Sequence, residues 1–303
     1  MTTIPQPALD LLCLEITGRC QLACAHCYAD SGPTGTDGSM TVADWTDVID
    51  QAADLGVRLV QFIGGEPLLY RALPTLIGHA LASGLQAEVY SNLVHVSDAM
   101  WQVLAQPGVR LATSFYSDDP IQHTRITGRD TLPRTQANIG KAVRRGIPLR
   151  VGLVDLGDGQ RVEQARSLLT DLGVTNLGVD RMRLLGRPAL RAGEASELCG
   201  RCGDGVAAIL PDGTVTPCPL GRWLSAGDVR HVPLRSLLGQ VRQITARDIR
   251  PVLDAHRPCE PSCNPGCDPG MHDPDSCSPK GRCDPNQPPA PACKPSVSCK
   301  PKG

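Results

Sequence analysis

The sequence predicts an α/β protein whose N-terminal part forms a parallel sheet flanked by helices. Short runs rich in Val, Leu and Ile alternate with amphipathic stretches from Leu11 to about Arg183. The apolar runs lack strict polar alternation, which is typical of strands buried on both faces. Repeated strand–helix–strand units give right-handed crossovers and a parallel sheet, either open or closed into a barrel. In both forms ligands bind at the C-terminal ends of the strands.

The elements follow one another in a regular order. We expect strands at residues 11–16, 58–63, 87–91, 109–115, 148–154 and 177–184, and helices at 41–56, 98–106, 135–146 and 161–173. The first helix is the clearest, because Thr41 and Asp44 resemble a capping pair and Gly56 is a C-terminal stop signal. Its apolar residues form one stripe: Trp45, Val48, Ile49, Ala52 and Leu55.

The alternation ends after Gly186. "PDG" at residues 211–213 lies between two short apolar runs and predicts a hairpin, and a helix is expected at 233–249. From Pro258 onward the chain has no aromatic residue and almost no aliphatic one, so this tail cannot build a core. Each of its seven cysteines is followed two places later by proline. This C-x-P repeat fits cluster ligands, a separate metal-binding or sulfur-handling arm, or a disordered segment.

Charge and composition exclude several classes. The 303 residues carry a net charge of -1 with acids and bases interspersed, which disfavours nucleic-acid and membrane-surface partners. The N-terminus has no signal peptide, so we expect a cytoplasmic protein. In that reducing compartment fourteen cysteines indicate metal or redox chemistry rather than disulfides.

Three of these cysteines, Cys20, Cys24 and Cys27, lie just past the first expected strand in "CQLACAHC". A zinc knuckle usually adds a second cysteine pair nearby, and none is present here. An iron–sulfur cubane normally takes four cysteines, so three leave one iron without a protein ligand. An open metal position is where a catalytic site binds its substrate or cofactor.

This C-x3-C-x2-C arrangement after a first strand, with His26 before the third cysteine and Tyr28 after it, resembles the radical S-adenosylmethionine (SAM) enzymes. The resemblance implies a partial (β/α)6 TIM-type barrel over residues 1–186. It also implies a [4Fe-4S] cluster on the three cysteines and SAM at the open iron. His26 and Tyr28 would then flank the adenosyl group.

Further residues match the family in order. Gly64, Gly65 and Glu66 begin "GGEP", which in the family contacts the amino group of SAM. Glycine permits close backbone approach and Glu supplies an acceptor for an ammonium. The resemblance places the remaining SAM contacts on later strands: Ser91, Asn92 and Ser114, with Arg125 or Arg129 for the SAM carboxylate, and Gly152 and Arg183 lining the pocket.

The middle of the chain resembles the SPASM extension of radical SAM enzymes that modify peptides and proteins. Cys202, ten residues, Gly213, four residues and Cys218 fit its opening, and Cys199 adds a candidate ligand. The resemblance implies a small C-terminal cysteine-rich SPASM-like extension at 187–257, followed by the tail at 258–303. One or two auxiliary iron–sulfur clusters are implied, the first completed by Cys259 and the second drawn from the tail, including Cys263 and Cys267.

The expected activity is reductive cleavage of SAM to a 5′-deoxyadenosyl radical that modifies a peptide, by crosslinking or oxidation of a ribosomally made precursor. Only about ten residues precede the first strand, so we expect the leader peptide to be bound by a separate leader-recognition protein, by the barrel mouth or by the tail. An electron donor such as flavodoxin or ferredoxin is also implied. Two alternatives are a radical SAM enzyme acting on a small molecule and a non-catalytic iron–sulfur or zinc protein.

Overall fold

The computed structural model describes residues 9–157, 159–191 and 193–255. The expected ligands Cys259, Cys263 and Cys267, with the rest of the C-x-P tail, lie outside these residues. Across the described ranges, no helix is long and apolar enough to cross a membrane.

In the described part of the chain, nine strands form one sheet in the order β6-β5-β4-β3-β2-β1-β7-β8-β9. The first six pair in parallel and confirm the six expected strands. Their bounds are β1 Leu11–Thr17, β2 Leu59–Gly64, β3 Gln86–Tyr90, β4 Val109–Phe115, β5 Leu149–Asp155 and β6 Asn176–Arg181. The C-terminal ends of these strands therefore meet at one edge, as the parallel order requires.

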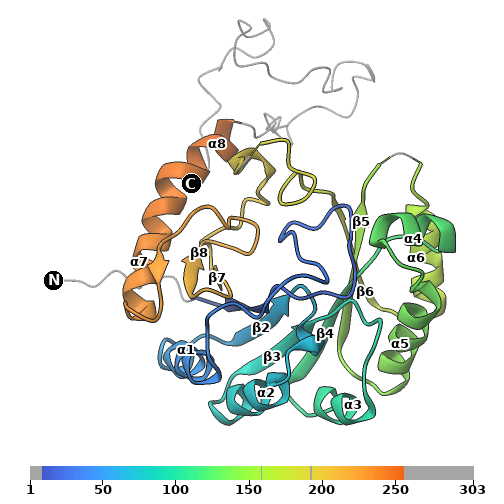
Figure 1. Cartoon of the computed structure of the whole chain (residues 1–303), viewed down its shortest axis with the longest axis horizontal. Coiled ribbons are helices and arrows are strands. Elements are labelled where there is room, and N and C mark those ends of the chain that lie inside the picture. Colours follow the sequence, from blue (N-terminus) through green and yellow to red (C-terminus); the bar gives the residue numbers. More distant parts are fainter. Residues whose placement is uncertain (1–8, 158, 192, 256–303) are drawn as a thin grey trace, which may run out of the picture.

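The four expected N-terminal helices are confirmed as α1 Val42–Asp54, α3 Asp98–Leu104, α5 Leu132–Arg144 and α6 Val162–Asp171. Two others were not expected: α2 Leu73–Ala82 and α4 Pro120–Thr127. Short 3-10 turns form at Pro67–Leu69 and Ala195–Glu197. Figure 1 shows α1, α2, α3 and α5 along the outer side of the curved sheet.

The capping pair of α1 forms as expected. The Thr41 hydroxyl accepts a bond from the Asp44 N–H at 3.2 Å, and the Asp44 carboxylate accepts one from the Thr41 N–H at 2.8 Å. Two otherwise unpaired N–H groups of the first turn are satisfied in this way. The capping pair therefore determines the residue at which α1 begins and at which the cysteine-containing loop before it ends.

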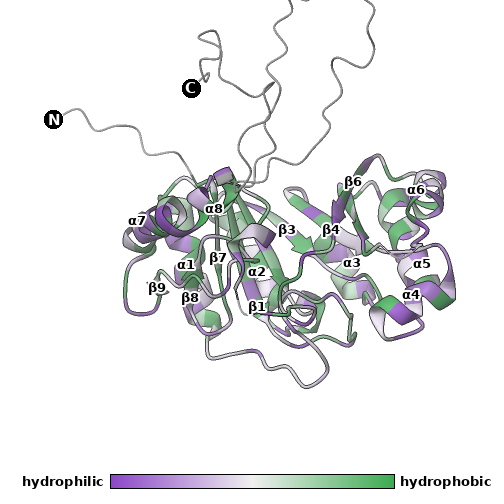
Figure 2. Ribbon diagram, turned by 90° about the horizontal axis from the view of Figure 1, so that it is seen from above, coloured by the Kyte–Doolittle hydropathy of each residue, from purple (hydrophilic) through white to green (hydrophobic). Residues whose placement is uncertain are grey.

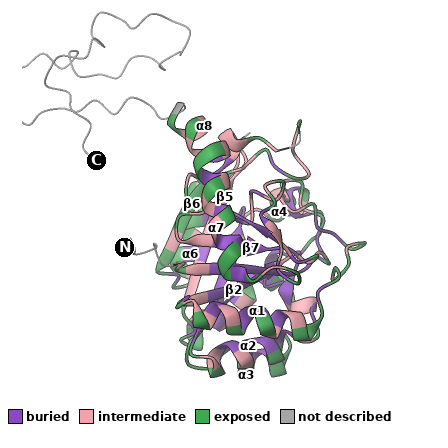
Figure 3. Ribbon diagram, turned by 90° about the vertical axis from the view of Figure 1, so that its left-hand side faces the viewer, coloured by how far each residue is buried: buried purple, intermediate pink, exposed green. Residues whose placement is uncertain are grey.

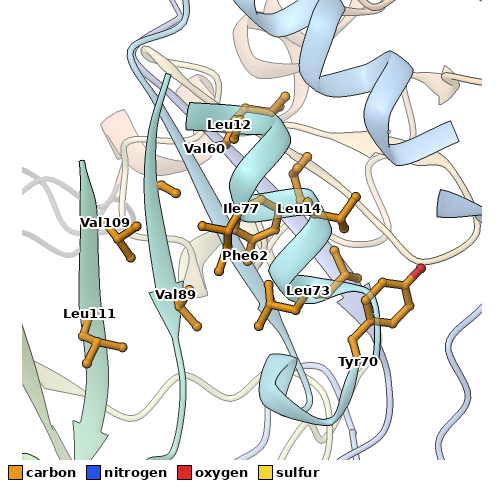
Figure 4. Close-up of a cluster of buried hydrophobic side chains, with 14 of the residues drawn as sticks. Leu12, Leu14, Val60, Phe62, Tyr70, Leu73, Ile77, Val89, Val109 and Leu111 are labelled. Carbon is orange, nitrogen blue, oxygen red and sulfur yellow. The ribbon is translucent and has the colours of Figure 1, made fainter. Parts of the chain in front are cut away.

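The main core lies between the sheet and the outer helices. Leu12 and Leu14 of β1 and Phe62 of β2 pack against Leu73 and Ile77 of α2 (Figure 4). Apolar residues fill the strands and buried residues gather in the interior (Figures 2 and 3). Side chains alternate along a strand, so the residues of β1 that lie between the outward-facing leucines point to the inner face of the sheet. These inner-face residues include Cys13, Glu15 and Thr17, all buried.

The expected hairpin is confirmed by β7 Val206–Ile209 and β8 Thr214–Thr216, which pair antiparallel. Strand β7 also pairs in parallel with β1, so the hairpin extends the sheet beyond its first strand, and β9 Gly227–Asp228 adds a short edge. The expected helix at 233–249 is α7 Leu234–Ile244 followed by a π-helical turn, Thr245–Ile249. Helix α8 Arg250–Ala255 continues from it.

Candidate active site

The three N-terminal cysteines lie on the loop between β1 and α1, at the C-terminal edge of the sheet, as the sequence predicted. We call residues 18–41 the cysteine loop. Cys20 is buried, Cys24 and Cys27 are half-buried, and no disulfide within the described residues involves them. Three thiols thus gather where parallel sheets bind ligands.

Two of these sulfurs each accept a hydrogen bond from one main-chain N–H group. The Leu22 N–H lies 3.4 Å from the Sγ of Cys20, and the Ser31 N–H lies 3.3 Å from the Sγ of Cys27. Burial raises the pKa of Cys20 to about 11 and that of Cys24 to about 12. Thiols with such pKa values lose their protons to solvent when they bind a metal as thiolates, and N–H donors then stabilise the thiolate charge.

The donor set fits an iron–sulfur cubane. Among residues 9–157, 159–191 and 193–255, no three His, Cys, Asp or Glu side chains converge on a single ion. A cubane does not need such convergence, because each cysteine binds a different iron. Three soft sulfur atoms are suitable ligands for such a cluster, and the N–H groups donate hydrogen bonds to two of them.

The glycines of "GGEP" lie against the end of β1 and the start of the cysteine loop. Gly64 ends β2 with a φ of +154°, and a Cβ there would lie 2.3 Å from the carbonyl oxygen of Thr17. A Cβ on Gly65 would lie 2.4 Å from the carbonyl oxygen of Arg19 and 2.9 Å from the Cβ of Cys20. Both positions therefore require glycine for the loop to approach β2.

Glu66 is buried and its carboxylate accepts main-chain bonds from two elements. The Leu68 N–H donates to Oε1 at 3.0 Å and the Asn92 N–H donates to Oε2 at 2.8 Å. Burial raises the pKa of Glu66 to about 7, and these bonds together with one from the Ser91 side chain oppose the rise. Such a carboxylate is ready to accept a cation, because pairing would offset its desolvation.

Asn92 connects this carboxylate to the cysteine loop. Its side-chain amide pairs with that of Gln21 through bonds of 3.0 and 3.3 Å, and its Nδ2 lies 3.8 Å from the Sγ of Cys20. The Ser91 hydroxyl accepts the Leu93 N–H at 3.0 Å. The expected residues Ser91 and Asn92 are therefore brought together with Glu66 and Cys20.

Ser114 lies on β4, where its hydroxyl is 2.9 Å from the hydroxyl of Tyr90 on β3. Gly152 on β5 faces the same phenol, since a Cβ there would lie 3.5 Å from the Tyr90 hydroxyl. Arg183 lies farther round the sheet, where it pairs with Asp180 at 2.6 Å. Ser114 and Gly152 thus share one neighbour, whereas Arg183 is tied to its own strand end.

His26 and Tyr28 face different surroundings. The His26 ring packs against that of Tyr116 with centroids 4.6 Å apart, and its buried Nδ1 has no hydrogen-bond partner among the described residues. Burial lowers the pKa of His26 to about 4, so the ring is neutral at pH 7. Tyr28 instead packs on the apolar cluster that contains Cys202 and Cys218.

The expected cation Arg125 is exposed on the last turn of α4, and Arg129 is exposed just beyond that helix. The carbonyls beside them hold the cysteine loop: the Ala23 N–H donates to Thr127 at 3.1 Å and the Ala25 N–H donates to Ile126 at 3.0 Å. The end of α4 therefore borders the cysteine loop, with both arginines next to it.

The second group of cysteines also comes together. The Sγ atoms of Cys202 and Cys218, both buried, lie 2.7 Å apart. A hydrogen bond from the Cys202 thiol lowers the pKa of the exposed Cys199 to about 5. Leu198, Ile249 and Leu253 pack around the pair, so α8 closes one side of this thiol group.

Two features were not predicted from the sequence. Arg187 binds several groups of the cysteine loop, although it lies far away in the chain. On the inner face of the sheet, Cys13 donates to Gln61, Gln61 to Glu88, and Arg150 pairs with Glu88 at 2.9 Å. This second network could have been predicted from the polar residues at alternate positions of β1, β2, β3 and β5, because alternate positions of a strand lie on one face of the sheet.

Comparisons with known proteins agree with this geometry. The PqqA peptide cyclase of Xanthomonas oryzae pv. oryzae is 36% identical over 157 residues, which are 51% of this chain and 41% of that relative. This chain spans less than half the length of such curated relatives. Streptococcus suis SuiB bound to its precursor peptide SuiA shares the fold, with a TM-score of 0.65 at 15% identity over 76% of this chain and 64% of SuiB.

A third similarity is to anSMEcpe with bound AdoMet, with a TM-score of 0.62 at 12% identity over 77% of this chain and 81% of that protein. Residues 14–172 match the profile of the radical SAM superfamily. This segment is more than half of the chain and contains the cysteine loop, "GGEP" and the end of α4. The chain therefore belongs to the radical SAM superfamily.

Proposed function

We propose that this protein cleaves SAM reductively and uses the resulting radical to modify a peptide. The observation that carries the proposal is the cysteine loop packed against Glu66 and Asn92, which joins a cluster site to a cation-accepting carboxylate. A bound [4Fe-4S] cluster would supply one electron to SAM, whose C5′–S bond breaks to give methionine and a 5′-deoxyadenosyl radical, which takes a hydrogen atom from a C–H bond. The peptide class is supported by the PqqA peptide cyclase and SuiB similarities.

Cys20, Cys24 and Cys27 are assigned to three irons of the cluster, and SAM to the fourth. Of the roughly four lone-pair sites of the Glu66 carboxylate, Leu68, Asn92 and Ser91 use three, which leaves about one for the SAM ammonium. Gly64 and Gly65 permit the close approach. The other proposed SAM contacts keep their assignments: Ser91, Asn92 and Ser114, with His26 and Tyr28 beside the adenosyl group and Arg125 or Arg129 at the carboxylate.

We assign Cys199, Cys202 and Cys218 to an auxiliary cluster in a SPASM-like extension. Their proximity supports this assignment, and Cys259, which lies outside the described residues, is proposed as the fourth ligand. A second auxiliary cluster would use Cys263 and Cys267. The proposed boundaries are 1–186 for the core, 187–257 for the extension and 258–303 for the tail.

The same proposal implies partners. The cluster needs an electron donor such as flavodoxin or ferredoxin, and the proposed binder of the leader peptide is a separate leader-recognition protein, the barrel mouth or the tail. Iron–sulfur ligation and free thiols suit the reducing cytoplasm, where we place the protein.

The test uses perdeuterated peptides in an anaerobic reaction with reconstituted protein, SAM and dithionite. Radical attack on a peptide transfers deuterium to 5′-deoxyadenosine and removes it from that peptide, and mass spectrometry detects both changes. Deuterium uptake from at least one peptide would support a peptide substrate. Uptake from a panel of deuterated sugars and small metabolites, but from none of the peptides, would favour the small-molecule alternative.

A further inference from the structure

The segment after β6 returns to the cysteine loop and touches its main chain. Gly186 has a φ of +66°, and a Cβ there would lie 2.1 Å from the carbonyl oxygen of Tyr28 and 2.5 Å from that of Cys27. Only glycine admits this approach. It places the main-chain N–H of Arg187 2.9 Å from the carbonyl oxygen of Cys27.

The Arg187 side chain then makes three further contacts with the same loop. Nη1 donates to the carbonyl oxygen of Cys24, Nη2 to that of Ser31 at 2.7 Å, and Nε to the Asp30 carboxylate at 3.0 Å. Asp30 has a φ of +51°, a left-handed conformation that aspartate adopts more readily than most non-glycine residues and that the contact with Arg187 stabilises. The planar guanidinium fits three acceptors in fixed directions, which a lysine cannot do.

Over the part of the chain that the structure describes, the end of α4 bonds none of the three cysteines directly, whereas Arg187 bonds two of them. The α4 carbonyls bind the N–H groups of Ala23 and Ala25, whereas Arg187 binds the carbonyls of Cys24 and Cys27. A positive charge that is only 29% exposed therefore lies beside two of the three proposed iron ligands. Its field is screened by solvent less than that of a surface arginine, and the Asp30 carboxylate that offsets part of it is 69% exposed.

We propose that Arg187 is a positioning residue for the cluster ligands Cys24 and Cys27, and that its charge raises the reduction potential of the cluster. The inference rests on the proposed function, because it needs the cluster on the cysteine loop. Reduction adds one negative charge, so a nearby cation favours the reduced form. Arg187 thus makes reduction of the cluster by its electron donor easier, which is the step that precedes electron transfer to SAM.

Four variants separate geometry from charge. Arg187→Gln removes the positive charge. Arg187→Lys keeps the charge but loses the planar guanidinium that reaches three acceptors. Gly186→Ala disturbs the contact with the cysteine loop while Arg187 is retained. Arg166→Gln is the matched control, since Arg166 makes an exposed 3.5 Å pair with Glu163 on α6. Three measurements follow for each: thermal unfolding of the apo-protein, the rate of iron loss to a chelator, and the midpoint potential of the EPR signal that responds to added SAM.

We expect Arg187→Gln, Arg187→Lys and Gly186→Ala all to lose iron faster, roughly ten-fold for the arginine variants. We expect the midpoint potential to fall in Arg187→Gln alone. Wild-type iron loss in all three, or an unchanged potential in Arg187→Gln, would overturn the inference. A wild-type protein that takes up no cluster would instead contradict the proposed function, so the two failures are distinguishable.

Discussion

The main-chain N–H of Asn92 donates a 2.8 Å hydrogen bond to the buried carboxylate of Glu66. This bond joins the C-terminal ends of β3 and β2, and the Asn92 side chain continues to the thiol of Cys20. The proposed SAM acceptor and a proposed iron ligand are therefore linked through one residue. Such a link would keep the two cofactor sites at a fixed separation.

Glu66→Gln should weaken SAM binding by roughly ten- to hundred-fold. The change removes a charge-assisted hydrogen bond to the ammonium, which contributes about 1.5 to 3 kcal/mol. Calorimetric titration of SAM into the reconstituted protein measures the change. Glu163→Gln, an exposed carboxylate on α6, is the control. Equal SAM affinity in Glu66→Gln and wild type would refute this role of Glu66.

The raised pKa of Glu66 predicts a pH-dependent stability. The folded-state pKa is about 7, against 4.5 as the unperturbed value, so the folded apo-protein keeps a proton that the unfolded chain releases. The stabilisation is complete below pH 4.5 and is lost as the pH rises through 7. Urea unfolding should show wild type losing about 2 to 3 kcal/mol more than Glu66→Gln between pH 5 and 8. Parallel pH profiles would contradict the shift.

Gly65→Ala should destabilise the apo-protein and slow cluster uptake, because its Cβ would collide with the Arg19 carbonyl. We expect a loss of about 1 to 3 kcal/mol, as in other overpacked sites. Gly78→Ala in α2 is the matched control, since a Cβ there meets nothing within 4 Å and alanine favours helices. Thermal unfolding and iron content measure both effects. Similar stability in the two variants would show that the loop can move away.

Cys202→Ser should remove one auxiliary cluster, about four irons per chain, and leave the cluster on the cysteine loop. Cys13→Ser is the matched control: Cys13 is equally buried, and its thiol donates to Gln61 on the inner face of the sheet. Iron and sulfide analysis after anaerobic reconstitution measures the difference. An unchanged iron content in Cys202→Ser would remove the auxiliary assignment.

The local signals in the sequence predicted most of the core. The apolar run of β1 and the cysteines after it place the candidate site, and Thr41 with Asp44 predicts the start of α1. Helix α2 could also have been predicted, since Leu73, Leu76, Ile77 and Ala80 have helical spacing. Helix α4 buries few apolar residues, and its signals are the N-cap Asp119 and the C-terminal Gly128.

Long-range contacts could not be predicted from one sequence. Arg187 binds residues more than 150 positions earlier, and neither its spacing nor its neighbours indicate this. Likewise, nothing local in residues 206–209 indicates that β7 pairs with β1. The packing of Tyr28 against the cluster that contains Cys202 and Cys218 is another long-range contact of this kind.

The most direct test of the account compares wild type with the Cys20→Ala, Cys24→Ala, Cys27→Ala triple variant in one anaerobic reaction with SAM and dithionite. Chromatography with mass spectrometry measures methionine and 5′-deoxyadenosine. We predict equimolar release of both by wild type and none above the protein-free blank by the triple variant. SAM cleavage by the triple variant at the wild-type rate would contradict the assignment of these three cysteines and the radical chemistry proposed to depend on them.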